Sequence, residues 1–524
     1  MDARATESGA WTRLELVLLA AFVVIAGAST LWLVHPWYER ANDASIYLLT
    51  ARSLAHGEGY SYLGEPFTVR PPGFSALLAP FLGGDAIDFR ALNLYVSAFG
   101  VAGLALFFAW IRTRLGAALA FALCLAIWFN PAWQHLCNMV LSDVPGTALL
   151  FLCLVLERRF ERSTRTRALE TGARPPASEL GARATLLRDV LLGLAIGLAS
   201  LVRTMNVLLA PAIVIERACA LWRDGRRGKE LLAALARRAL PLAIGAALAL
   251  EPWSLWSAAH RPDGAVDQLY VHSYSTAMWH TDIGDPHSPL RPLSDVAARV
   301  PDRAEKLVAL LGSRMQAPET GGVELLLGAL VLAGVLVVLW RRRAASEWFV
   351  FGAAAMLLVF ASFLDRHALP VWILACGAAL EGLLLVLERL RAPRALAQAI
   401  AIALVASVAW VDWAPRHKWD VVEESHLQME RYCAAAAKEL APDARPAAML
   451  GWHYSVYLGR PVWSLMFVQQ RQGVGALPAL LERERIDTVL LSELMPTRPD
   501  VEAALAPRVL RSVDVELGRV LHLE

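Results

Sequence analysis

The stretch that decides the fold is Leu14 to Val34, LELVLLAAFVVIAGASTLWLV, which is followed a few residues later by Asn42-Asp43. This run is long enough to cross a bilayer as one helix, and it lacks the small-residue cleavage site of a signal peptide. We therefore expect it to remain as a membrane anchor. Asp43 would then lie at the outer membrane–water boundary, where an acid can meet a lipid head group and a soluble acceptor together.

Composition supports a membrane protein. Of the 524 residues, 56% are hydrophobic and only 19% are charged, and the mean hydropathy is +0.44. These values are too apolar for an ordinary soluble chain of this length. The net charge of +2 is uninformative by itself. The positions of the arginines carry more information, because Lys and Arg accumulate in short cytoplasmic loops.

Apolar runs along the chain give eleven candidate membrane spans. They are residues 14–34, 91–111, 117–133, 141–156, 189–201, 204–216, 239–258, 323–340, 345–363, 371–388 and 395–413. The stretch 189–215 is interrupted by Arg203 and has strongly basic flanks on both sides. Flanks of one sign imply one side of the membrane, so we predict a hairpin that turns at Arg203.

The hairpin has consequences for the site and for the topology. Each arm of about 13 residues would cover only about 20 Å of a roughly 30 Å core, so protein must cover the turn. Arg203 would then lie at the floor of an outward-facing cavity. The same topology places Arg341-Arg342-Arg343 and residues 389–394 in the cytoplasm, and it places the loops 35–90 and 259–322 outside.

We predict two domains. Residues 1–413 form the transmembrane domain, and residues 414–524 form a small soluble α/β domain on the periplasmic face. In the second domain, amphipathic helices near 423–440 and 475–485 alternate with two short apolar runs. In the first outer loop, Pro71-Pro72-Gly73 predicts a short helix that runs to Phe81 and is too short to span.

Short motifs in the outward loops follow a distinctive order. They are Asn42-Asp43 with Tyr47, Leu54 to Tyr60, Pro66, Pro71-Pro72-Gly73, Ser142-Asp143 and Asp365 to Pro370. This set resembles the integral-membrane GT-C glycosyltransferases, and its nearest branch is the protein-mannosyltransferase and aminoarabinose-transferase type. The resemblance implies an α-helical polytopic membrane protein of GT-C type, here with about eleven transmembrane helices. Members use polyprenyl-phosphate-linked sugars on the non-cytoplasmic face.

The resemblance implies a glycosyltransferase that moves a sugar from a polyprenyl-phosphate donor to a lipid, glycan or protein acceptor. We expect inversion at the anomeric carbon and, from the Ala-, Leu- and Arg-rich composition, a bacterial inner membrane. Asp43 would be the catalytic base and Asp143 a second active-site carboxylate, while cations hold the leaving phosphate. The candidate substrate-binding residues are Asn42, Tyr47, Arg70, Arg203, Arg366 and His367. Membrane lipids are expected partners and nucleic acid is not.

Each candidate has a simpler interpretation. Asp43 and Asp143 could be helix N-caps, and Arg203 could be a hairpin residue that reaches toward water. Arg366 and Arg70 could contact lipid head groups at the membrane surface. The two carboxylates could hold a divalent metal, although so few oxygen ligands do not establish one. Histidines and aspartates of the loop 259–322 match no structural zinc spacing.

Two other classes of function remain open on the sequence. Broken helices and an intramembrane arginine also occur in transporters and lipid flippases, which predicts paired discontinuous helices in two related halves. A GT-C-like scaffold without catalysis is the third alternative. The identities of the sugar and the acceptor, the metal dependence and the oligomeric state do not follow from the sequence.

Overall fold

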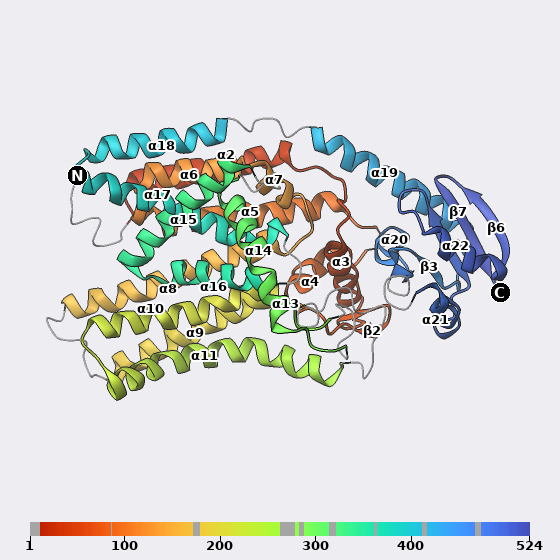
Figure 1. The fold of residues 1–524 in the computed structure, drawn as a ribbon, viewed down its shortest axis with the longest axis horizontal. Coiled ribbons are helices and arrows are strands. Elements are labelled where there is room, and N and C mark those ends of the chain that lie inside the picture. Colours follow the sequence, from red (N-terminus) through yellow and green to blue (C-terminus); the bar gives the residue numbers. More distant parts are fainter. Residues whose placement is uncertain are drawn as a thin grey trace.

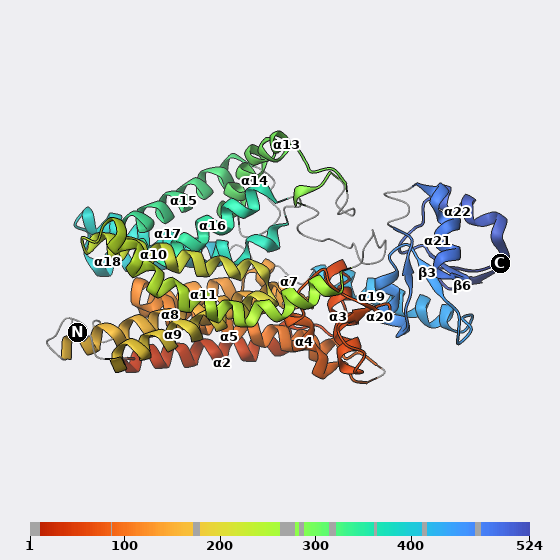
Figure 2. The same cartoon turned by 90° about the horizontal axis from the view of Figure 1, so that it is seen from below.

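The computed structural model describes residues 11–84, 86–170, 179–261, 278–281, 288–313, 321–360, 364–410, 417–466 and 473–524. Long helices lie side by side along the long axis of the molecule, and a small sheet lies at one end (Figures 1 and 2). The protein is therefore an α-helical polytopic membrane protein with a small α/β region at its C-terminus, as the sequence predicts.

Within the described residues, seven helices are long and apolar enough to cross a membrane, and a bent pair would make an eighth. The seven are formed by α2 (Arg13–Leu33), α5 (Phe89–Leu115), α9 (Glu179–Val202), α10 (Leu209–Arg223) together with the short helix η2 (Thr204–Leu208) before it, α11 (Gly228–Ala259), α15 (Gly322–Arg342) and α17 (Leu369–Arg389). The bent pair is α6 (Ala117–Trp128) and α7 (Pro131–Cys137), with an angle of 65°. The predicted count of about eleven is not confirmed.

Three further helices belong to the bundle without passing that test. They are α8 (Asp143–Glu170), α16 (Ala345–Val359) and α18 (Arg394–Trp410). The last two are apolar but short. α8 carries charged side chains toward its C-terminal half, including the buried Glu157. Helices of this kind are stable at membrane depth where neighbouring helices cover their polar groups.

The predicted hairpin at Arg203 is present. α9 ends at Val202, and the short helix η2 (Thr204–Leu208) leads into α10. Arg217 of α10 forms an ion pair of 2.5 Å with Asp189 of α9, so the two arms run back beside each other. The arms are longer than predicted, with spans of 19 and 20 residues. They continue into the arginine-rich flanks and reach about 30 Å each, so the prediction of short arms was wrong.

The loop of residues 35–90, which we expect to lie outside, folds into a compact unit. It contains α3 (Asn42–Ala55), the antiparallel strands β1 (Ser61–Tyr62) and β2 (Glu65–Pro66), α4 (Gly73–Leu78) and η1 (Ala79–Phe81). The predicted short helix is thus confirmed as α4 with η1. α4 lies against the end of α9, where a Cβ atom on Gly73 would come within 2.5 Å of the Leu201 carbonyl carbon.

The second outer loop contains helices that the sequence analysis did not predict. α13 (Leu293–Ala298) leads into α14 (Val300–Gly312). Outside this loop, the short helix η3 (Asp365–Ala368) directly precedes α17. α14 lies directly on α15, because a Cβ atom on Gly328 would lie 1.8 Å from the Val308 carbonyl oxygen. This close approach, which only glycine permits, extends the bundle on the side of the site.

The C-terminal region is a five-stranded mixed sheet with helices. Its elements are α19 (His417–Ala437), β3 (Pro446–Ala448), α20 (Gly451–Leu458), β4 (Trp463–Ser464), η5 (Val474–Ala476), α21 (Leu477–Glu484), β5 (Thr488–Ser492), α22 (Pro499–Leu505), η6 (Ala506–Arg508), β6 (Val509–Val515) and β7 (Gly518–Leu523). The strand order is β4-β3-β5-β7-β6. β3 is parallel to β4 and β5, whereas β7 is antiparallel to its two neighbours.

The core of this region follows from its sequence pattern. Every residue of β5 is buried, which is typical of a central strand covered on both faces. The predicted helices near 423–440 and 475–485 correspond to α19 and α21. The predicted boundary at residue 413 lies outside the described residues, so the division into two domains stays a prediction.

Candidate active site

Asp43 lies in the first turn of α3 and points to two arginines. Its Oδ1 is 2.8 Å from an Arg70 nitrogen, and its Oδ2 is 2.5 Å from an Arg366 nitrogen. The N-cap position of α3 is Ala41, and no side chain caps that helix by a hydrogen bond. The interpretation of Asp43 as an N-cap is therefore wrong, because its carboxylate is engaged with cations from two distant segments.

Asp143 begins α8 and is almost fully buried, with 2% of its side chain exposed. Its Oδ1 is 2.9 Å from an Arg203 nitrogen, so the arginine at the hairpin turn faces this carboxylate. A second nitrogen of Arg366 lies 3.8 Å from Oδ2 of Asp143. Arg366 therefore lies between the two acids and connects Asp43 with Asp143.

The charges of this cluster set the protonation state of the Asp43 carboxyl group. Burial is the largest single influence and tends to raise the pKa of its carboxyl, but Arg70 and Arg366 together hold that pKa below its usual value. Asp43 is therefore ionised at physiological pH. Its buried charge is compensated because both oxygens face guanidinium groups.

Tyr47 and Ser142 join the two carboxylate segments. The Tyr47 hydroxyl is 3.2 Å from the Ser142 Oγ, and Arg203 donates to the same Oγ at 3.5 Å. The Arg70 guanidinium carbon lies 5.7 Å from the centre of the Tyr47 ring, which is cation–π distance. The ring thus helps to position the arginine that faces Asp43.

A cavity of about 250 Å³ opens beside these groups. Its polar part includes Tyr47, Arg70, Ser142, Arg203 and His367. The rest of the lining is mostly apolar and comes from the end of α9, from η2, from α16 and from the described part of the second outer loop. These residues are Val202, Met205, Val207, Leu208, Met278, Trp279, Met356, Leu357 and Phe360. Two arginines of the cluster, Arg70 and Arg203, therefore line a mostly apolar chamber.

The structure brings together seven of the eight predicted site residues. Asp43, Asp143, Arg70, Arg203 and Arg366 form the ion-pair cluster, while Tyr47 and His367 line the cavity beside it. The eighth, Asn42, is oriented differently. Its Oδ1 lies 3.2 Å from Trp452 Nε1 and 3.2 Å from His453 Nε2, so its side chain faces α20.

No local sequence pattern predicts the contact between α3 and α20. His453 Nδ1 lies 2.7 Å from the Ser45 Oγ, which is in turn 2.7 Å from the Tyr38 hydroxyl. Asn42 Oδ1 can only accept, so Nε2 of His453 donates and Nδ1 accepts from Ser45. These hydrogen bonds hold the first turn of α3, the helix that carries Asp43. They join segments that are far apart in the sequence, so only the folded structure shows them.

The carboxylates do not fit a resident divalent metal in this arrangement. Each of the oxygens of Asp43 and Asp143 faces an arginine, and a cation would have to displace these partners. Among the described residues, no group of three His, Cys, Asp or Glu side chains is placed to hold a metal. His280 is described, whereas His272, Asp282, Asp285 and His287 of the same loop lie outside the described residues.

Comparisons with known proteins identify the fold. No protein-family model and no curated protein sequence matches this chain. The solved structure of apo ArnT from Cupriavidus metallidurans matches with a TM-score of 0.57 and 18% identity, over 96% of this chain and 98% of ArnT. The fold is the GT-C fold. ArnT bound to undecaprenyl phosphate matches with a TM-score of 0.55 and 18% identity, over 97% of each chain.

A second GT-C structure is more distant. The archaeal oligosaccharyltransferase AglB from Archaeoglobus fulgidus, in complex with an inhibitory peptide and a dolichol-phosphate, matches with a TM-score of 0.53 and 13% identity. The match covers 92% of this chain and 70% of AglB. At these identities the likeness establishes the GT-C fold, and the chemistry has to be argued from the site itself.

Proposed function

We propose that this protein is a membrane glycosyltransferase that takes a sugar from a polyprenyl-phosphate-linked donor. The observation that carries the proposal is the cluster of Asp43 and Asp143 with three arginines, two of which line a mostly apolar cavity. A donor of this kind has an apolar chain, a phosphate and a sugar in sequence. The cavity offers an apolar lining together with the guanidinium groups of Arg70 and Arg203, and each of these arginines pairs with one of the two carboxylates. The ArnT structure that contains undecaprenyl phosphate has the same fold.

The arginines would bind the phosphate that leaves. Arg70 and Arg203 both line the cavity, and Arg366 connects the two acids beside it. Planar guanidinium groups suit bidentate binding of phosphate oxygens. Positive charge held at the position where negative charge develops stabilises the transition state, and one such donor contributes about 10²–10³ in rate.

Donor binding would also change Asp43. A phosphate that attracts Arg70 and Arg366 weakens their hold on the carboxylate, and burial, which raises the pKa, then dominates. Asp43 thereby becomes a stronger base when the donor is present. An acceptor hydroxyl would attack the anomeric carbon with inversion, its proton would pass to Asp43, and the bond between that carbon and the phosphate oxygen would break. Polyprenyl phosphate leaves with the electron pair.

The site would face the periplasm of a bacterial inner membrane. Arg341 to Arg343 and the arginines of 389–394 lie at the ends of α15 and α17 that are remote from Asp43, and α17 begins next to Arg366. Basic ends of this kind favour the cytoplasm. The first outer loop and the C-terminal sheet lie at the opposite end of the bundle (Figure 1). The acceptor would be a lipid, a glycan or a protein that reaches this outer face.

The experiment that tests the function compares lipids and glycans by mass spectrometry in four strains. These carry a deletion, the wild-type gene, Asp43→Asn or Asp365→Asn. Asp365 neighbours Arg366 but takes no part in the ion pairs of the cluster among the described residues, so D365N is a matched control. We expect the deletion and D43N to lack one sugar modification and to accumulate its lipid-linked donor. D365N should resemble wild type at equal protein level.

The same profiles separate the alternatives. A transporter or flippase would leave the modification dependent on the protein but insensitive to D43N, because transport needs no carboxylate at that point. A non-catalytic scaffold would leave the profile unchanged both in the deletion strain and in D43N. Wild-type levels of the modification in D43N, with normal insertion into the membrane, would rule out the proposed mechanism.

A further inference from the structure

A second cavity lies at the end of the bundle remote from the candidate active site. Its volume is about 420 Å³, within the range of about 300–1,000 Å³ typical of small-molecule sites. Glu157 in its lining lies about 21 Å along α8 from Asp143, at about 1.5 Å per residue. The lining residues with ionisable side chains are Arg114, Glu157, Arg158, Glu216, Arg223, Arg341 and Arg342.

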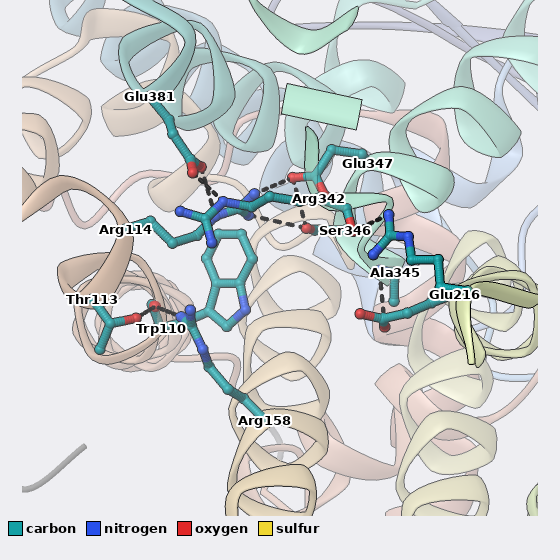
Figure 3. Close-up of polar contacts among 11 residues, drawn as sticks. Trp110, Thr113, Arg114, Arg158, Glu216, Arg342, Ala345, Ser346, Glu347 and Glu381 are labelled. Carbon is teal, nitrogen blue, oxygen red and sulfur yellow. Dashed lines mark hydrogen bonds and ion pairs between the residues drawn. The ribbon is translucent and has the colours of Figure 1, made fainter. Parts of the chain in front are cut away.

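The inner wall of this cavity is a buried ion network (Figure 3). Arg114 has only 3% of its side chain exposed, and it lies 2.6 Å from Glu347 and 2.7 Å from Glu381. Arg342 at the end of α15 forms an ion pair with the same Glu381. The guanidinium of Arg114 also lies 4.8 Å from the centre of the Trp110 ring. These contacts make a fixed wall whose charges compensate one another.

The outer part of the lining carries excess positive charge. Arg223 and Arg341 are exposed, and neither forms an ion pair with another described residue. Arg158 donates to the backbone carbonyl of Trp110. Glu216 accepts from the Ala345 N–H at 3.1 Å, so its negative charge is placed at the N-terminus of α16. The guanidinium groups at the mouth therefore remain suited to a further anion.

Two exposed tryptophans indicate the depth of the mouth. Trp222 is 53% exposed and precedes Arg223, while Trp340 is 77% exposed and precedes Arg341. Tryptophan is enriched at the level of the lipid head groups, and arginine beside it binds lipid phosphate. The mouth therefore lies at the membrane boundary opposite the first outer loop. An anion that reaches it from the bilayer would be a phospholipid head group.

We infer that this cavity binds the phosphate group of an anionic membrane lipid from the leaflet opposite the candidate active site. Arg223 and Arg341 would bind the phosphate at the mouth, and Arg158 lies behind them in the lining. The head group would enter the space above the fixed wall of Arg114. Such a lipid would hold the end of α10 against the end of α15 and the start of α16, which follow much later in the chain.

The test uses the full-length protein in detergent and measures lipid binding by native mass spectrometry and by thermal shift. The probes are phosphatidylglycerol, phosphatidylcholine and inorganic phosphate. The variant is R223Q/R341Q, and the control is R389Q/R394Q, which removes two exposed arginines at the same end but outside the cavity. Loss of about fivefold in affinity per arginine, from about 1 kcal/mol each, predicts about 25-fold weaker phosphatidylglycerol binding in the variant.

Each outcome decides the inference. Weakened phosphatidylglycerol binding in R223Q/R341Q, with wild-type binding in the control, supports it. Equal binding in all three proteins, or phosphatidylcholine binding as tight as phosphatidylglycerol binding, overturns it. If inorganic phosphate alone raises the Tm of the wild type and not of the variant, the ligand is a soluble phosphate and the lipid assignment is overturned. None of these measurements depends on sugar transfer, so the proposed function is tested separately.

Discussion

Arg366 is the residue that connects the two acids of the candidate site. Its nitrogens lie 2.5 Å from Asp43 and 3.8 Å from Asp143, so one planar guanidinium serves carboxylates from two separate segments. A lysine ammonium at the same place is a point charge on a flexible stem and cannot present two separated donors in a fixed plane. The geometry of the side chain therefore matters here as well as its charge.

We expect Arg366→Lys to lower the rate of sugar transfer by about 100-fold, the usual cost of one misplaced electrostatic donor. The measurement is product formation in isolated membranes, normalised to the amount of inserted protein. Arg389→Lys, at the far end of α17, the helix that follows η3, is the control and should keep the wild-type rate. A rate in R366K within about twofold of wild type would contradict a role for the planar guanidinium.

At the scale of elements, the approach of α4 to α9 brings the arginines together. Gly73 begins α4 three residues after Arg70, and Leu201 lies in the last turn of α9, two residues before Arg203. A Cβ atom on Gly73 would lie 2.5 Å from the Leu201 carbonyl carbon and 2.6 Å from its oxygen. Both contacts are with backbone, which cannot move aside as a flexible side chain would. The absence of a side chain at Gly73 thus sets the distance between two phosphate-binding candidates.

We expect Gly73→Ala to destabilise the protein by about 1–3 kcal/mol, the cost of overpacking a tight contact, and to lower transfer as well. Gly352→Ala in α16 is the matched control, because a Cβ atom there meets no atom within 4 Å. It should be neutral or stabilise by up to about 1 kcal/mol through helix propensity. Thermal unfolding of both variants in the same detergent is the measurement. Equal Tm values would show that α4 can shift without cost.

At the scale of the whole molecule, the C-terminal region contacts the helix that carries Asp43. His453 of α20 is buried and hydrogen-bonds Ser45 and Asn42 of α3. Burial, with a smaller contribution from Arg40, lowers the pKa of His453 to about 3. The folded protein therefore holds this imidazole neutral, although an unfolded histidine has a pKa near 6.5. Protonation favours the unfolded chain, so this contribution to stability is complete above about pH 6.5 and is lost as pH falls toward 3.

We expect acid to destabilise the contact between α20 and α3, by about 2 kcal/mol at about pH 5 relative to neutral pH. His453→Gln keeps a donor and an acceptor but does not titrate, so its Tm should fall less over the same range. His260→Gln changes an exposed histidine and should fall as the wild type does. Thermal unfolding at both pH values measures the difference. Parallel curves for wild type and H453Q would contradict the assignment.

The sequence by itself determined the membrane class, the hairpin at Arg203 and most residues of the site. Apolar runs, arginine-rich flanks and the order of motifs such as Asn42-Asp43 and Ser142-Asp143 are local signals, and a bilayer imposes the same length and polarity on every span. The cost of an arginine within an apolar stretch was enough to single out Arg203.

Only the tertiary structure decided which groups meet. The hairpin arms continue past their predicted ends, and Arg217, just beyond the predicted span 204–216, forms an ion pair with Asp189 of the other arm. The orientation of Asn42 depended on α20, more than 400 residues further along the chain. Contacts between such distant segments follow from packing and have no periodicity in the sequence. For that reason the contacts of α3, the helix that carries Asp43, with the C-terminal region became visible only in the fold. The same holds for the arginine-lined cavity at the other end of the bundle.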